Sequence, residues 1–305
     1  MTDTNPRHFL DADDLTADEL ETVLDLAAEY KRKQRVGEAH PDLERKTLGM
    51  LFQKPSTRTR VSFETGMTQL GGHAVFLGED DIHLGRGEPL RDTARALSRY
   101  VDVVMARVFK HGNAVELARH STVPVVNGLT DDAHPCQTLA DLLTIRESVG
   151  TEVSVAWIGD GNNVAQSFAL GCALCGIDCT IATPDGYGID EAVVERAAEI
   201  GEPPTVTTDP EAAAEGADVL YTDVWISMGQ EDERDLREDA FSGFQVNEEL
   251  VTLAGDPIVM HCLPAHRGEE ITNDVIEGER SVVWEQAENR LHAQKALLVW
   301  LLDAA

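Results

Sequence analysis

Short apolar runs alternate with amphipathic segments along most of this chain. The runs are nearly uninterrupted, which is typical of strands buried on both faces of a parallel sheet. The segments between them carry apolar residues at the spacing of one helix face. The pattern predicts strands at 47–52, 74–77, 102–107, 123–127, 153–158, 178–182, 218–222, 258–262 and 282–284, and helices at 16–34, 59–70, 92–99, 113–120, 135–149 and 285–302.

This alternation predicts an α/β protein with two doubly wound parallel-sheet domains and helices on both faces of each sheet. A length of 305 residues suits two domains of about 150 residues. We place the boundary in the helix near residue 140, which gives domains of residues 1–140 and 141–284, and we expect helix 285–305 to pack back onto the first. Ligands of such sheets bind at the carboxyl ends of strands, so an active site is expected in the interdomain cleft.

Charge excludes several classes of partner. The chain carries 55 acidic and 25 basic residues, a formal net charge of −30, and such a surface repels nucleic acid and anionic membranes. An acidic, lysine-poor composition resembles that of halophilic proteins, in which salt screens self-repulsion. The polar, acidic amino terminus and the absence of a long apolar run predict a cytoplasmic protein.

The five cysteines are an odd number, which argues against a disulfide framework. Cys172, Cys175 and Cys179 lie in an apolar helix end and the strand after it. No histidine or second cysteine pair lies nearby to complete a zinc site. We therefore interpret them as buried apolar side chains and expect no metal.

The run Gln-Lys-Pro-Ser-Thr-Arg-Thr-Arg at 53–60 joins a predicted strand to a predicted helix. Pro55 suits a first helical turn. Hydroxyl groups, guanidinium groups and free backbone N–H groups would then gather at a helix N-terminus, which favours a phosphate group. The alternative is a capped surface helix with solvated arginines, but two arginines beside three hydroxyls are unexpected in so acidic a chain.

Other polar groups follow the remaining strands. Arg107 closes the third strand, and His134 and Gln137 lie one helical turn apart after the fourth. A histidine there can donate to a carbonyl oxygen on which negative charge develops. Asp223 and Ser227 could hold the ammonium and carboxylate groups of an amino acid.

Two further strand ends give weaker signals. Residues 159–163, Gly-Asp-Gly-Asn-Asn, resemble the opening of a dinucleotide fingerprint, but Val164 stands at the third glycine position. Cys262 ends a strand, and His261 is expected to point to the opposite face. Cys262 is therefore interpreted as a polarising contact and not as a nucleophile with a neighbouring base.

Four motifs in order carry a family resemblance. The Ser-Thr-Arg-Thr-Arg run at 56–60 and His-Pro-Cys-Gln at 134–137 resemble the aspartate and ornithine carbamoyltransferases. Residues 223–229 and 261–264 are similar to the ornithine branch, and residues 88–95 resemble a loop and helix of the same family. The resemblance implies transfer of the carbamoyl group of carbamoyl phosphate to the side-chain amine of ornithine. It implies no cofactor, and assembly as a homotrimer or a multiple of trimers.

The resemblance also implies roles for individual residues. Those implied to bind carbamoyl phosphate are Ser56, Thr57, Arg58, Thr59, His83, Arg107, His134, Gln137, Cys262, Leu263 and Arg290. Those implied to bind ornithine are Asn163, Asp223, Ser227 and Met228, and those implied in catalysis are Arg58, Arg107, His134 and Cys262. His83 stands where the family often has a glutamine that reaches a neighbouring subunit's site.

Three alternatives remain open. The acceptor could be another amine such as putrescine, which lacks the carboxylate that Ser227 would bind. A nicotinamide-dependent oxidoreductase could use the glycines at 159 and 161. A catalytically inactive scaffold is a third possibility, against which the arginines and His134 argue. The sequence leaves the cellular direction of the reaction open.

Overall fold

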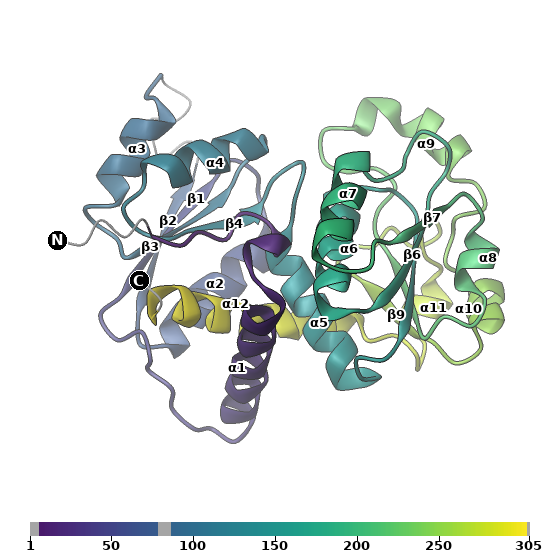
Figure 1. Cartoon of the computed structure of the whole chain (residues 1–305), viewed down its shortest axis with the longest axis horizontal. Coiled ribbons are helices and arrows are strands. Elements are labelled where there is room, and N and C mark those ends of the chain that lie inside the picture. The colour runs from purple at the N-terminus through teal and green to yellow at the C-terminus, as the bar shows by residue number, and fades with distance from the viewer. Residues whose placement is uncertain (1–5, 79–86, 304–305) are drawn as a thin grey trace. The chain divides into compact units, whose positions relative to one another are not determined.

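The computed structural model describes residues 6–78 and 87–303 of the chain. It divides into two compact units, one formed by residues 1–140 and 289–305 and the other by residues 141–288. The division falls within two helices, α5 (Pro135–Ser148) and α12 (Val283–Asp303). Both helices therefore contribute residues to each unit (Figure 1).

The first unit is built on a four-stranded, fully parallel sheet with the order β2-β1-β3-β4. Figure 1 shows α3 and α4 on one face of this sheet and α2 and α12 on the other. The elements are β1 (Thr47–Phe52), β2 (His73–Gly78), β3 (Val103–Arg107) and β4 (Val125–Leu129), with η1 (Ala12–Asp14), α1 (Ala17–Arg35), α2 (Thr57–Gln69), α3 (Leu90–Leu97) and α4 (His111–His120).

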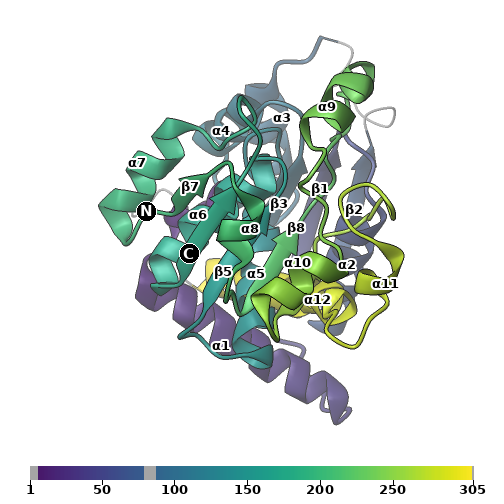
Figure 2. The ribbon, with the colours of Figure 1, turned by 90° about the vertical axis from the view of Figure 1, so that its right-hand side faces the viewer.

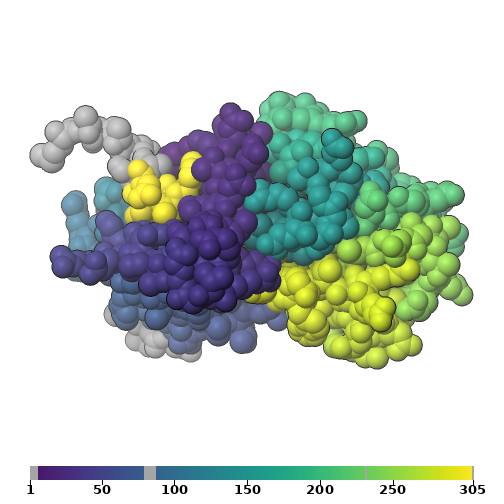
Figure 3. Space-filling model, turned by 90° about the horizontal axis from the view of Figure 1, so that it is seen from below, coloured from purple at the N-terminus to yellow at the C-terminus, as the bar shows by residue number. Residues whose placement is uncertain are grey.

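Local signals fix the helix ends in this unit. Thr16 caps α1 and forms the predicted capping box with Glu19. Residues near both ends of the described chain pack together: in Figure 3 the purple N-terminal part borders the yellow end of α12. There the Arg7 guanidinium carbon lies 4.6 Å from the centroid of the Trp300 ring.

The second unit contains a five-stranded, fully parallel sheet with the order β7-β6-β5-β8-β9. Helices α6 and α7 pack together on one face, and α8, α10 and α11 cover the other (Figure 2). The elements are β5 (Ser154–Ile158), β6 (Asp178–Ala182), β7 (Thr205–Thr207), β8 (Val219–Thr222) and β9 (Ile258–His261), with α6 (Asn163–Cys175), α7 (Glu191–Ile200), α8 (Pro210–Ala214), η3 (Glu231–Glu233), α9 (Arg234–Ala240), α10 (Glu248–Ala254) and α11 (Asn273–Ile276). The predicted parallel α/β class is confirmed.

Strand order reverses once in each sheet. In the first unit β2 lies on one side of β1, whereas the later strands β3 and β4 lie on the other side. In the second unit β6 and β7 lie on one side of β5, and β8 and β9 lie on the other. The loops after these strands diverge to opposite faces, and the crevice between them is where α/β sheets bind ligands. Both crevices are lined by polar segments that the sequence analysis selected: residues 53–60 and 107 in one, residues 159–163 and 223–229 in the other.

Many predicted ends are shifted by a residue or two, and three differences go further. Residues 282–284 are not a strand: Val283 begins α12, and the apolar run before it adds only a bridge from Ser281 to Val259 and a 3.0 Å bond from Val282 N to the Val259 carbonyl. Val283 is buried, but Trp284 is 56% exposed at the start of the helix. A short apolar run does not by itself distinguish the first turn of a helix from a strand. Pro55 lies before the helix cap, because α2 begins at Thr57. Strand β7 was missed because it is short and mostly exposed.

Gly161 is required by packing in the second unit. A Cβ atom there would lie 2.4 Å from the carbonyl carbon of Gly188 and 2.5 Å from the Ile189 nitrogen. We expect Gly161→Ala to lower the free energy of unfolding by about 1–3 kcal/mol, because backbone atoms must move to relieve the overlap. Urea denaturation would measure the change.

The matched control is Gly112→Ala, near the start of α4, where an added Cβ meets nothing within 4 Å. That change should be neutral or stabilise by up to about 1 kcal/mol. Equal effects at Gly112 and Gly161 would contradict the packing argument.

Candidate active site

The N-terminus of α2 gathers the predicted phosphate-binding groups of the first unit. Ser56 is the N-cap, and its hydroxyl oxygen accepts a hydrogen bond from Thr59 N at 3.2 Å. Parallel pairing aligns Phe52 with Arg107, and Gln53 N donates to the Arg107 carbonyl at 2.8 Å. The end of β3 therefore lies beside the segment that leads into α2.

Three guanidinium groups converge near this helix end. Arg107 is 5% exposed, and burial followed by repulsion from Arg290 and Arg58 lowers its pKa to about 9. Its buried Nε has no hydrogen-bond acceptor among the residues that the structure describes. Guanidinium groups that repel one another in this way are stabilised when an anion binds between them.

Arg290 reaches this locus from α12. Its Nη2 donates to Thr59 Oγ1 at 2.9 Å, and its Nη1 donates to Gln137 Oε1 at 2.9 Å. One buried side chain therefore connects the start of α2 with the start of α5. From the sequence, a role for Arg290 in binding carbamoyl phosphate was implied only by the family resemblance.

His134 is held neutral. The side chain is 4% exposed, and burial, followed by the positive fields of Arg290, Arg107 and Arg58, lowers its pKa well below 6.5. Pro135 follows it as the first residue of α5, and Gln137 N donates to the His134 carbonyl at 2.9 Å. A neutral imidazole can still donate one hydrogen bond, which suits polarisation of a carbonyl oxygen.

Lys54 is a buried charged residue of the same segment for which the sequence predicted no role. It is 5% exposed, forms an ion pair with Asp131, and has its Nζ 4.8 Å from the centroid of the Phe109 ring. The pair joins the segment after β1 to the turn before His134. A lysine inside the 53–60 run was the available signal, but its partner lies far away in the sequence.

The second unit gathers the predicted amino-acid contacts. Asp223 directly follows β8 and is 6% exposed. Asn162 Nδ2 donates to Asp223 Oδ2 at 2.8 Å, while Asn162 Oδ1 caps α6 by accepting from Val164 N and Ala165 N. The residue predicted from the sequence was the neighbouring Asn163, the first residue of α6. The contact from the N-cap residue Asn162 to the Asp223 carboxylate was not predicted.

Residues Ser227 and Met228 lie farther along the same segment. Ser227 N donates to Gln230 Oε1 at 3.0 Å, and Gln230 N donates to the Ser227 carbonyl at 3.1 Å. Met228 is 49% exposed. This turn presents the Ser227 side chain beyond Asp223 on one continuous stretch of chain.

The glycines at 159–161 serve the protein's own packing. Gly161 N donates to the Tyr187 carbonyl at 2.8 Å, and the backbone of residues 187–189 fills the space against Gly161. A dinucleotide fingerprint needs both that close approach and that N–H group for a pyrophosphate. The geometry therefore disfavours the oxidoreductase alternative.

His261 is not turned away from Cys262, contrary to the sequence-based expectation. Single side-chain atoms of Asp223, His261 and Cys262 all lie within 4.8 Å of one another. Strand alternation fails because β9 ends at His261 and Leu263 has a positive φ of 59°.

His261 nevertheless does not fit the role of a base for Cys262. Its Nδ1 accepts from Leu263 N at 2.9 Å, and its Nε2 lies 2.9 Å from Glu270 Oε1. Both ring nitrogens are therefore engaged, and the reading of Cys262 as a contact to substrate remains a prediction.

Two groups of side chains in residues 6–78 and 87–303 have the composition of a metal site. One is Asp223, His261 and Cys262, and the other is His266, Glu269 and Glu270. Glu269 pairs with Arg234 at 3.4 Å, and Glu270 accepts from His266 N at 2.6 Å. A metal ion would have to displace these bonds and those of His261.

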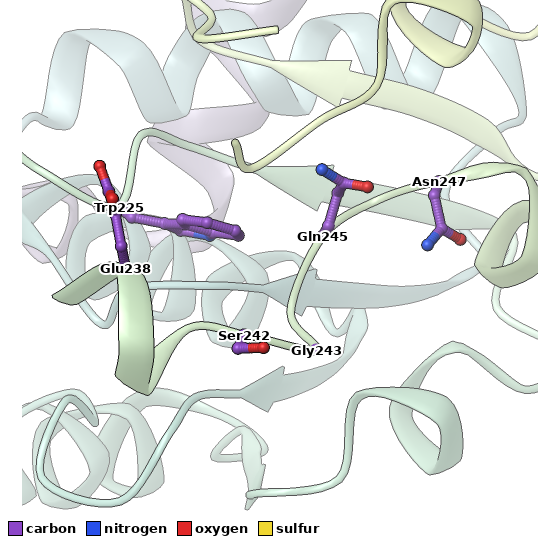
Figure 4. Close-up of a pocket in the computed structure, with 6 residues that line it drawn as sticks. All are labelled: Trp225, Glu238, Ser242, Gly243, Gln245 and Asn247. Carbon is purple, nitrogen blue, oxygen red and sulfur yellow. The ribbon is translucent and has the colours of Figure 1, made fainter. Parts of the chain in front are cut away.

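A separate recess of about 340 Å³ opens in the second unit. Figure 4 shows the indole of Trp225 directed into it. The lining residues, to which the sequence analysis gave no role, are Trp225, Glu238, Ser242, Gly243, Gln245 and Asn247. His83 lies outside the described residues. None of the helices described is long and apolar enough to cross a membrane.

The two loci define a class of protein. A buried cationic crevice beside a neutral imidazole suits a phosphorylated donor, and a second parallel-sheet unit carries a carboxylate at its own crevice. The chain is thus a two-unit α/β protein with the features of a group-transfer enzyme.

Comparison with known proteins identifies the family. A sequence model described as the carbamoyl-P binding domain of aspartate/ornithine carbamoyltransferase matches residues 7–147, and one described as the Asp/Orn binding domain matches residues 151–301. The chain is 63% identical over 298 residues to an ornithine carbamoyltransferase of Haloquadratum walsbyi, covering 97% of this chain and 98% of the relative. The chain belongs to the aspartate/ornithine carbamoyltransferase family.

Other relatives agree. An ornithine carbamoyltransferase of Archaeoglobus fulgidus is 54% identical over 299 residues, 97% of each chain. The solved ornithine carbamoyltransferase from Pyrococcus furiosus superimposes with a TM-score of 0.94 at 53% identity, covering 98% of each chain.

The depressed pKa of His134 makes a prediction about acid stability. The folded protein keeps His134 neutral below pH 6.5, whereas the unfolded chain binds a proton near that pH. The unfolded state therefore holds more protons, and the free energy of unfolding falls as pH drops below about 6.5. We expect His134→Gln to show a flatter decline between pH 7 and pH 5.

Urea denaturation at constant salt would measure this slope. His292, whose pKa burial lowers to about 3, acts in the same direction, so a His134→Gln/His292→Gln double variant should be flatter still. A slope unchanged by either substitution would contradict the assignment.

Proposed function

We propose that this protein is an ornithine carbamoyltransferase, which transfers the carbamoyl group of carbamoyl phosphate to the side-chain amine of L-ornithine and releases L-citrulline and phosphate. The observation that carries the proposal is the convergence of Arg58, Arg107 and Arg290 on the N-terminus of α2 beside neutral His134. Membership of the family, with close relatives named ornithine carbamoyltransferase, supports the same reaction.

The first unit is proposed to bind carbamoyl phosphate. Ser56, Thr57, Arg58, Thr59 and Arg107 would hold the phosphate, where the helix N-terminus and the guanidinium groups offset its charge. His134, Gln137 and Arg290 would hold the carbamoyl group. For Cys262 and the Leu263 carbonyl, which belong to the second unit, the proposed contact with carbamoyl phosphate rests on the family resemblance alone. The Thr59–Arg290–Gln137 hydrogen bonds support this division, because they join the two sets through one side chain.

The second unit is proposed to bind ornithine. Asp223, fixed by Asn162 at 2.8 Å, would accept the α-ammonium group, with Asn163 beside it. Ser227 and Met228 would bind the α-carboxylate. Putrescine has no such carboxylate, so an enzyme with this segment should prefer ornithine.

The chemistry needs little covalent help from the protein. The neutral δ-amine attacks the carbamoyl carbon, the C–O bond to phosphate breaks, and the amine loses a proton to solvent or phosphate. Phosphate is already a good leaving group, so the enzyme has to neutralise charge, polarise the carbonyl and hold the amine within about 3–3.5 Å of the carbon. Arg58 and Arg107 suit the first task, and His134 with Arg58 suits the second.

Assembly and location follow as further proposals. Family membership supports a homotrimer or a multiple of trimers, and His83 is proposed to reach a neighbouring subunit's site. None of the five cysteines forms a disulfide, which supports a reducing compartment such as the cytoplasm. The net charge of −30 supports adaptation to high salt.

A steady-state assay tests the function directly. Purified protein in several-molar KCl is given carbamoyl phosphate with ornithine, putrescine or aspartate, and the carbamoylated product is measured. Citrulline should form fastest by a wide margin. Faster turnover of putrescine would replace the proposed acceptor, and the absence of any carbamoylated product would reject the function.

Arg58→Ala should abolish most turnover with little loss of stability. Removing a charge-assisted donor from developing negative charge costs roughly 10²–10³-fold in rate. The control is Arg60→Ala, since Arg60 is exposed in an ion pair with Glu64 at 2.9 Å and should matter little. If Arg58→Ala keeps more than a tenth of wild-type activity, the phosphate site lies elsewhere.

Asp223→Asn should raise the KM for ornithine far more than the KM for carbamoyl phosphate. The proposed contact to the ammonium group exists in ground and transition states alike, so binding and not kcat takes most of the loss. Exposed Asp185→Asn serves as the control. Equal changes in both KM values would reject the assignment of Asp223 to ornithine.

Salt should control assembly. The Debye length is about 30 Å at 0.01 M salt and about 3 Å at 1 M, so subunits with 30 excess negative charges repel strongly in dilute buffer. We expect dissociation and then inactivation below a few tenths molar KCl. Sedimentation and activity over a KCl series would test this, and an intact, active oligomer in dilute buffer would defeat it.

A further inference from the structure

A buried ion pair lies in the second unit outside the proposed substrate contacts. Arg237, on α9, is 6% exposed, and Asp160, in the loop after β5, is 5% exposed. Arg237 Nη1 donates to Asp160 Oδ2 at 3.1 Å. We propose that Arg237 is a positioning residue that holds segment 223–229 in the conformation that binds the amino-acid substrate.

Arg237 Nε also pairs with Glu233 Oε2 at 3.3 Å within the same helical region, and the remaining contacts of Arg237 tie three strand-end loops together. Its Nη1 also donates to the Trp225 carbonyl at 2.8 Å, in the segment after β8. Its guanidinium carbon lies 4.9 Å from the centroid of the Tyr187 ring, in the loop after β6. With Asp160 after β5, one side chain bridges the loops that follow β5, β6 and β8, and two of these strands flank the strand-order reversal.

The Trp225 carbonyl is the critical acceptor, because Trp225 stands between Asp223 and Ser227. Residues 223–230 form no helix or strand, so contacts to side chains set their backbone path. The indole adds a second restraint, stacked on Phe241 with ring centroids 5.7 Å apart and planes at 22°. Fixing this one peptide group fixes the spacing of the carboxylate and the hydroxyl on either side of it.

Stability alone gives a poor reason for this ion pair. Burial, helped by the negative charges of Asp223 and Glu233, raises the pKa of Asp160 to about 6. The neighbouring Arg237 acts in the opposite direction and lowers this pKa, but it does not cancel the increase. Burial and the neighbouring carboxylates together outweigh the attraction of Arg237 for Asp160. A buried ion pair is often no more stable than apolar side chains of similar volume. What apolar residues cannot supply is the directional bond to the Trp225 carbonyl.

The inference rests on the proposed function, since it assigns Arg237 to the segment that would bind ornithine. Arg237 itself touches no proposed substrate position, so its effect must pass through residues 223–229. Misplacement of a binding group by about 1 Å can cost on the order of 10²-fold. The loss should therefore appear in the KM for ornithine, with the KM for carbamoyl phosphate little changed.

The test uses four variants of the full-length protein in high salt: Arg237→Met, Arg237→Lys, Asp160→Asn/Arg237→Met and, as control, Arg234→Met. Arg234 lies on the same helix in an exposed ion pair with Glu238 at 2.9 Å. Arg237→Lys keeps the positive charge near Asp160 and Asp223 but loses the planar fork. The double variant removes both buried charges, so it recovers stability if Arg237→Met alone folds poorly.

Two readouts are combined: steady-state constants for each substrate, and hydrogen exchange of the peptide containing residues 223–229. We expect faster exchange in that peptide and a KM for ornithine raised about tenfold or more in Arg237→Met and in the double variant. Arg237→Lys should fall between these variants and wild type. Arg234→Met should match wild type in both readouts.

The outcomes separate this inference from the function it rests on. Unchanged exchange at 223–229 in the double variant would overturn the inference, as would equal loss for both substrates or full recovery of the ornithine KM once stability is restored. Faster exchange with an unchanged ornithine KM would uphold the role of Arg237 and instead reject the binding of ornithine by this segment.

Discussion

Parallel pairing of β1 with β3 and of β5 with β8 is the constraint on which both candidate sites depend. Each pairing brings two strand ends to one edge of a sheet, and each stands where the strand order reverses. The loops that follow turn to opposite faces, and the crevice between them is where ligands of such sheets bind. The polar residues gather there because the topology leaves backbone N–H groups and helix ends exposed to a ligand.

The first unit concentrates positive charge within a strongly acidic protein. The lowered pKa values of Arg107 and His134 have one source: burial first, and then crowding by neighbouring guanidinium groups. Hydrogen bonds from Arg290 to Thr59 and Gln137 hold these groups together. The site thereby stays complementary to an anion in spite of the negative charge of the whole chain.

Local signals in the sequence were sufficient for much of this structure. The Ser-Thr-Arg-Thr-Arg run predicted a helix N-terminus, because the capping residue and the groups around it lie within one helical turn in the sequence. Near-continuous apolar runs predicted eight of the nine strands found in residues 6–78 and 87–303, with ends shifted by a residue or two. The strand predicted at 282–284 was wrong because a short apolar run can equally begin a helix, and here Val283 is buried while Trp284 is exposed.

Contacts between distant residues could not be read from the sequence. Arg290 and Thr59 form a hydrogen bond although they are 231 residues apart in the sequence. Lys54 and Asp131 form an ion pair across a separation of 77 residues. The orientation of His261 was also wrong, because the alternation rule ends where the strand ends and Leu263 turns into the left-handed region. In each case tertiary packing, and not local preference, decides where the side chain points.

The packing at Gly161 also limits what this scaffold can become. Its N–H group and the space beside it are already taken by residues 187–189. Restoring a glycine at Val164 would therefore not create a nucleotide pocket, because the obstacle lies in a different loop. Evolution toward a redox cofactor from this starting point would need remodelling of the connection between β6 and α7 first, and that step alone would undo the present packing without any immediate gain.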